Sequence, residues 1–121
     1  MSVNYGSKRV TVGAGYGIRD WLAQRVTGAL MASFTFVVLI QVLFISGPIG
    51  YEEWAGIFAA QWMKFLTFIT ILSLLYHAWV GIRDIWMDYI KPVGLRLCLH
   101  VASLVWLIGC AGWAVQALWR L

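Results

Sequence analysis

The stretch Phe65–Ile82, FLTFITILSLLYHAWVGI, decides the fold of this chain. It contains no Asp, Glu, Lys or Arg, and an apolar run of this length is typical of a helix that crosses a membrane. Two further uncharged stretches have a similar length, Thr27–Ser46 before it and Leu97–Trp119 after it. We therefore predict an all-α integral membrane protein whose three transmembrane helices form an antiparallel bundle.

The segments between these spans differ in composition. Gly47–Gly50 contains a proline and is followed by Glu52 and Glu53, and residues 83–96 are charged, so we expect both connections to be loops. Residues 1–17 are polar and rich in glycine, and they lack the apolar core of a signal peptide. We expect a single membrane domain over 1–121, with 1–17 as its N-terminal segment.

The composition excludes several classes of protein. Hydrophobic residues make up 62% of the 121 residues and charged residues 12%, against about 45–50% and about 25% in soluble domains. The mean hydropathy is +0.81. A soluble chain this small could not bury so much apolar surface, which excludes a soluble enzyme, a disordered tail and a nucleic-acid-binding module.

The basic residues predict an orientation. Seven of the nine lysines and arginines fall before the first span, at its start or between the second and third spans: Lys8, Arg9, Arg19, Arg25, Arg83, Lys91 and Arg96. Cytoplasmic segments of membrane proteins carry an excess of Lys and Arg. We therefore expect a cytoplasmic N-terminus and a C-terminus on the opposite side, and we attribute the net charge of +4 to topology.

Two histidines lie within the predicted spans, His77 and His100. Small or polar residues lie within about 40° of His77 on a helix with about 100° per residue: Thr70, Ser73, Gly81 and Asp84. Such a face would let a flat porphyrin approach the imidazole, but it equally suits tight packing of helices. Both interpretations remain open. His100 has an apolar face, which favours packing, although a haem held by both histidines is geometrically possible.

Three residues near the cytoplasmic side, and two cysteines, complete the candidates. Tyr89, beside Asp88, could donate a hydrogen bond to a lipid-soluble carbonyl compound, or it could be an ordinary interfacial tyrosine. Arg25 could bind a carboxylate or extend to lipid phosphate. Cys98 and Cys110 are twelve residues apart on one predicted helix, about 18 Å at the helical rise, so they cannot bridge each other.

The segment Ser73–Leu97, SLLYHAWVGIRDIWMDYIKPVGLRL, resembles the small hydrophobic membrane-anchor subunit of bacterial succinate dehydrogenase, complex II. That family has roughly the pattern S-x-x-x-H-A-x-x-G followed by D-Y-x-K-P-x-x-L-R. The resemblance covers the whole chain and includes an R-D-x-x-x-x-R entry to the first span and a Tyr51-Glu-x-Trp54 segment. It implies a membrane-anchor domain of three helices that packs with a partner anchor subunit.

The resemblance also implies roles for individual residues. His77 would be an axial ligand of the iron of haem b, with the second ligand supplied by the partner anchor subunit. Tyr89 would hydrogen-bond ubiquinone, Asp88 would support that network, and Arg25 would lie near a haem propionate. Arg19 aligns where better-known members have a histidine, so that contact is not carried over.

The function implied by the resemblance is electron transfer in the tricarboxylic acid cycle and respiratory chain. A flavoprotein subunit oxidises succinate, an iron-sulfur subunit carries the electrons, and this chain and a second, cytochrome b556-type anchor subunit form the quinone site. The chain would be a subunit of the enzyme without catalysis of its own, and it would lie in the bacterial inner membrane. Two alternatives remain: a self-contained cytochrome b that uses His77 and His100, or a haem-free assembly or transport protein.

Overall fold

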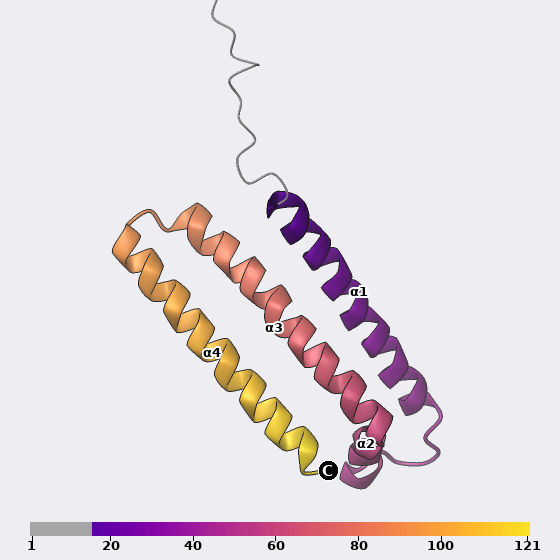
Figure 1. Cartoon of the computed structure of the whole chain (residues 1–121). Helices are drawn as coiled ribbons and strands as arrows, with labels where there is room; N and C mark the ends of the chain where they lie inside the picture. The colour runs from indigo at the N-terminus through magenta and orange to yellow at the C-terminus, as the bar shows by residue number, and fades with distance from the viewer. Residues whose placement is uncertain (1–15) are drawn as a thin grey trace, which may run out of the picture.

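The computed structural model describes residues 16–121, so the predictions for residues 1–15, including Lys8 and Arg9, lie outside it. This part of the chain forms four helices and no strand: α1 (Tyr16–Leu43), α2 (Tyr51–Ala59), α3 (Gln61–Tyr89) and α4 (Val93–Trp119) (Figure 1). The three long helices are long and apolar enough to cross a membrane, over Gly17–Leu43, Gln61–Tyr89 and Val93–Trp119. The prediction of three antiparallel transmembrane helices is confirmed.

The long helices extend past the uncharged stretches that predicted them. α3 continues from Ile82 to Tyr89 through several charged residues, because a charge at the membrane edge does not interrupt backbone hydrogen bonding. It ends where Ile90 becomes extended (φ −102°, ψ 110°), two residues before Pro92, which disfavours helix in the residue preceding it. α1 ends at Leu43, earlier than the predicted Ser46.

The first connection contains a short helix that the sequence did not predict. Residues 47–50 are non-helical as expected, and Gly47 has a φ of 90°, which favours glycine. Glu52 and Glu53, however, lie in the first turn of α2. The N–H of Gly50 donates a hydrogen bond to Oε2 of Glu53 at 2.9 Å, and acidic residues stabilise the positive end of the helix dipole. The glutamates therefore begin a helix.

α3 is the central helix of the bundle, and α1 and α4 pack on either side of it (Figure 1). The indole N–H of Trp86 on α3 donates to Oγ of Ser103 on α4 at 2.9 Å. At the opposite end of the same pair, Nζ of Lys64 donates to the backbone oxygen of Leu121 at 2.6 Å. These two polar contacts fix the register of α4 against α3 at both ends.

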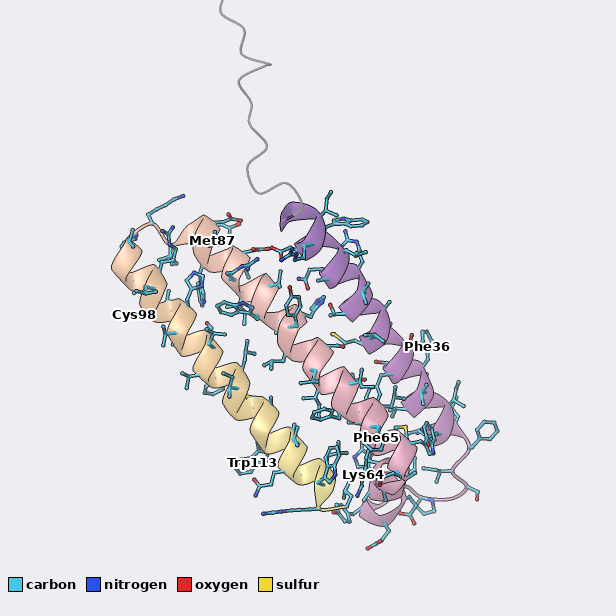
Figure 2. The ribbon with its side chains drawn as sticks, viewed as in Figure 1. Phe36, Lys64, Phe65, Met87, Cys98 and Trp113 are labelled. Carbon is cyan, nitrogen blue, oxygen red and sulfur yellow. The ribbon has the colours of Figure 1, made fainter. Side chains whose placement is uncertain are left out.

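One end of the bundle collects most of the positive charge, and we call it the basic end. It contains the start of α1, the end of α3 and the start of α4, and Figure 2 shows Met87 and Cys98 there and Lys64 at the other end. Five of the seven basic residues in 16–121 belong to it: Arg19, Arg25, Arg83, Lys91 and Arg96. The antiparallel fold thus brings together the two basic segments that the sequence analysis assigned to one side.

Very few side chains are buried within the chain itself. Among residues 17–121 the buried apolar side chains are Ile57, Met63, Val80 and Leu118, and the buried polar residue is Ser73. Many large apolar side chains of the three long helices are exposed. In a bilayer such surfaces contact lipid tails or neighbouring helices, and association depends on close packing. The outer surface of the bundle is therefore available to lipid and to neighbouring helices.

Candidate functional site

His77 belongs to α3, and its side chain lies against α1, which it contacts through one ring nitrogen. Its Nδ1 is 3.0 Å from Oγ1 of Thr27, and a Cβ added at Gly28 would lie 3.9 Å from its Cε1. The absence of a side chain at Gly28 thus gives the ring room beside the backbone of α1. His77 is half-buried, and its position is set by a hydrogen bond on one edge and a small residue alongside.

The other ring nitrogen of His77 is available. Among the described residues, no group forms a hydrogen bond with Nε2. A histidine that binds a metal uses one ring nitrogen as ligand while the other is held by a hydrogen bond, which is the arrangement at His77. The same part of the chain contains no cluster of three or more metal-binding side chains. The free Nε2 could therefore serve as one ligand to a haem iron.

His100 lies on the other side of α3. Its ring packs edge-on against Trp79, with centroids 5.7 Å apart and an interplanar angle of 72°. Trp79 follows His77 by two residues, which is about 200° around the helix. α3 therefore separates the two histidines, and the structure does not bring them together as a self-contained haem site would require. His100 contacts a neighbouring helix, as its apolar face suggested.

A polar cluster that was not predicted from the sequence lies at the basic end, about two turns beyond His77 on α3. Asp20 of α1 forms an ion pair with Arg83 of α3, and Arg83 is also 3.8 Å from Asp84. Two buried atoms here, Oε1 of Gln24 and Nε of Arg83 itself, have no hydrogen-bond partner within residues 16–121. Opposite charges at the same end of adjacent predicted helices were the available signal. The cluster ties α1 to α3 and leaves one donor and one acceptor unused.

Tyr89 and Asp88 lie at the end of α3, away from His77. Tyr89 is 77% exposed, and Asp88 is exposed as well. α3 continues to Tyr89, and Asp88 lies about 20° from His77 around the helix. Tyr89 is twelve residues from His77, about 18 Å along the axis. The two candidate positions are therefore separate, one within the span and one at its exposed end.

Arg25 lies apart from both His77 and Tyr89. Its guanidinium is 5.2 Å from the centroid of the Trp21 ring on the same helix, an arrangement that stabilises the cation. Arg25 precedes Thr27 by two residues and so projects from the opposite side of α1, about 200° away. The structure brings Thr27 to His77 and does not bring Arg25 there.

The cysteines take no part in this site. Cys98 and Cys110 are both free and exposed, and Figure 2 shows Cys98 near the start of α4 and Trp113 near its end. Cys110 lines a shallow apolar hollow on α4 together with Trp106 and Trp113. This hollow contains none of the candidate residues, and its lining is almost entirely apolar, so it has no chemistry beyond contact with lipid or another helix.

Two comparisons with known proteins agree with this arrangement. Residues 4–114 match the family described as succinate dehydrogenase/fumarate reductase transmembrane subunit. The chain is also similar to a succinate dehydrogenase hydrophobic membrane anchor subunit from Coxiella burnetii. The two are 40% identical over 103 residues, which cover 85% of this chain and 89% of the relative. The similarity therefore includes all three spans and is not limited to the motif around His77.

Proposed function

This chain belongs to the succinate dehydrogenase/fumarate reductase transmembrane subunit family, and from that premise we propose that it holds haem b and helps to bind ubiquinone in a succinate:ubiquinone oxidoreductase. It is a multi-pass membrane anchor, and its proposed part in the enzyme is structural and electron-transferring. The observation that carries the proposal is the state of His77, whose Nδ1 is hydrogen-bonded to Thr27 while Nε2 has no partner among the described residues.

In the proposed haem site, Nε2 of His77 would bind the iron from this chain, and a histidine of the second anchor subunit would supply the other protein ligand. When bound, haem b supplies a one-electron redox centre. The hydrogen bond from α1 holds the imidazole in one orientation, and Gly28 keeps the space beside its Cε1 free. Arg25 is proposed to bind a propionate. Its guanidinium is 5.2 Å from the Trp21 ring centroid and projects from the side of α1 away from Thr27.

The proposed quinone site lies at the exposed end of α3. The phenol of Tyr89 has no hydrogen-bond partner among the described residues and is largely exposed, so it is free to donate to a carbonyl oxygen of ubiquinone. Reduction of ubiquinone to ubiquinol takes up two electrons and two protons. Asp88 is next to Tyr89 in the sequence. We propose that its carboxylate supports the hydrogen-bond network around that quinone oxygen.

We propose that the chain spans the inner membrane of a bacterial cell and that its basic end faces the cytoplasm. Five of the described basic residues lie there, as expected for cytoplasmic segments. This end would contact the iron-sulfur subunit and, through it, the flavoprotein subunit, since positive surfaces steer partners of complementary charge. It would also place Tyr89 close to the subunit that delivers electrons to the quinone.

The decisive experiment compares two alanine variants of the assembled complex in membranes, His77→Ala and His100→Ala. Reduced-minus-oxidised spectra measure the b-type haem. We expect His77→Ala to lose or strongly alter the haem spectrum and His100→Ala to retain it. Both variants remove a histidine that packs against a neighbouring helix, His77 of α3 against α1 and His100 of α4 against α3, so His100→Ala controls for loss of packing. A normal low-spin spectrum in His77→Ala would refute the assignment.

A second measurement separates the proposal from the alternatives. The chain is produced with and without the second anchor subunit, and its haem content is measured in each case. A shared haem requires the partner subunit, because this chain supplies one axial ligand. A self-contained cytochrome b would bind haem without the partner, and a haem-free assembly or transport protein would bind none in either case.

A further inference from the structure

The hydroxyl of Thr27 has a single hydrogen, and the geometry indicates where it is used. Oγ1 lies 2.6 Å from the backbone oxygen of Ala23, one turn earlier in α1, and 3.3 Å from that of Gln24. The shorter distance is that of a strong O–H···O hydrogen bond. The hydroxyl therefore donates to the Ala23 carbonyl, and only its lone pairs remain for other partners.

The other threonines of the described helices behave in the same way. Thr35, Thr67 and Thr70 donate their hydroxyl hydrogens to the carbonyl four residues earlier, at 2.9, 2.6 and 2.9 Å. This is the usual bond of a threonine within a helix, where the backbone offers the nearest acceptor. Donation from Thr27 to Ala23 thus follows the pattern of the described helices and is not peculiar to the contact with His77.

The consequence concerns the proton of His77. Nδ1 lies 3.0 Å from the Thr27 oxygen, and an oxygen that has already donated its hydrogen can only accept. Nδ1 must therefore carry the hydrogen. A neutral imidazole has one N–H, so Nε2 is left with a free electron pair. An iron ligand needs that pair, whereas the other tautomer would place a hydrogen on Nε2.

We propose that Thr27 is a positioning residue that fixes His77 in the Nδ1–H tautomer and thereby prepares Nε2 to bind iron. This inference rests on the proposed haem site and goes beyond it, because it assigns a role to a residue of a different helix. Accepting the Nδ1 hydrogen also makes the imidazole a stronger electron donor, which favours ferric over ferrous iron. Thr27 should therefore lower the midpoint potential of the haem.

The test uses Thr27→Val and Thr27→Ser in the assembled complex, with a redox titration of the haem and the electron paramagnetic resonance spectrum of its ferric form. Valine keeps the shape and removes the acceptor, and serine keeps the acceptor. Changes to groups that orient metal ligands alter affinity about 10–100-fold. We expect Thr27→Val to weaken the preference for ferric iron about tenfold, which raises the midpoint potential by about 59 mV for one electron. Thr27→Ser should remain near wild type.

Thr35→Val is the matched control. It makes the same change on the same helix, at an exposed threonine whose hydroxyl donates to Met31 and contacts no histidine. We expect it to leave the potential and the ferric spectrum unchanged. If Thr27→Val does not assemble, Thr27→Ala gives the same readout with a smaller side chain.

Three results would overturn the proposal for Thr27. One is a wild-type potential and spectrum in the valine or alanine variant. Another is an equal shift in Thr27→Val and Thr27→Ser, which would indicate packing alone. The third is a lower potential in Thr27→Val, which would mean that the hydroxyl had donated to Nδ1. In each of these the loss of haem in His77→Ala still stands, so the haem site would survive. A wild-type complex without b-type haem would instead refute the proposed site and this inference together.

Discussion

Tyr89→Phe tests the proposed quinone site with very little disturbance to the fold. Tyr89 is 77% exposed at the end of α3 and has no hydrogen bond within the described part of the chain, so phenylalanine removes no contact made by this subunit. Its separation of about 18 Å from His77 along α3 protects the haem site. Any loss of quinone reduction in this variant would therefore come from the missing hydroxyl.

The size of the effect follows from the hydrogen bond that is lost. A neutral hydrogen bond contributes about 0.5–1.5 kcal/mol, and one to a charged group about 1.5–3 kcal/mol. The carbonyl oxygen of the quinone becomes more negative as electrons arrive, so the bond from Tyr89 should be strongest during reduction. A loss of about 1.4–2.8 kcal/mol in the transition state lowers the rate roughly tenfold to hundredfold.

The assay compares two electron acceptors in the same membranes. Ubiquinone reports on the whole path, and an artificial acceptor that takes electrons from the flavoprotein reports on succinate oxidation alone. We expect Tyr89→Phe to lose only the first activity, with a normal haem spectrum. Tyr51→Phe, at an equally exposed tyrosine near the other end of the molecule (72% exposed), should lose neither. Ubiquinone reduction at the wild-type rate would refute the reasoning, and an equal loss of both activities would indicate defective assembly.

Two further predictions concern the space beside His77 and the orientation of the chain. Gly28→Ala should retain the haem spectrum, because its Cβ would make an ordinary contact of 3.9 Å with Cε1 of His77. Gly28→Leu should lose most of the spectrum by displacing the ring, while Ala29→Leu, at an exposed neighbour on α1, should not. Reporter fusions at Lys91 should be scored as cytoplasmic and fusions after Leu121 as external; the reverse pattern would contradict the proposed docking side.

The spans could be predicted because lipid imposes a simple requirement. An uncharged run such as Phe65–Ile82 has one stable solution in a bilayer, a helix that satisfies its own backbone. The ends of the helices were harder to predict. The predicted spans ended at the first charged residues, whereas charged residues outside the hydrocarbon layer do not end a helix. α2 was missed for a related reason: Glu52 and Glu53 suggested a polar loop, whereas the bond from Gly50 to Glu53 shows that they begin a helix.

The candidate site was predictable only within a single helix. Periodicity placed Gly81 and Asp84 on the face of His77, because residues of one helix have a fixed angular relation. The contact with Thr27 depends on how α1 slides and turns against α3, and neither composition nor spacing determines that register. A polar residue at matching depth in an adjacent span was the available signal, and Thr27 stood at the very start of the predicted first span.

The scarcity of buried side chains gives the subunit an unusual dependence on concentration. Residues 17–121 bury only Ile57, Met63, Val80 and Leu118 among their apolar side chains, so they gain little cohesion from their own interior. Partners that bind only the folded form stabilise it by mass action, by about 2.7 kcal/mol when their free concentration is a hundred times the dissociation constant. The stability of this fold in a membrane therefore depends on how many partner subunits are present for each copy of the chain. A copy made in excess of its partners is the least stable form of the protein.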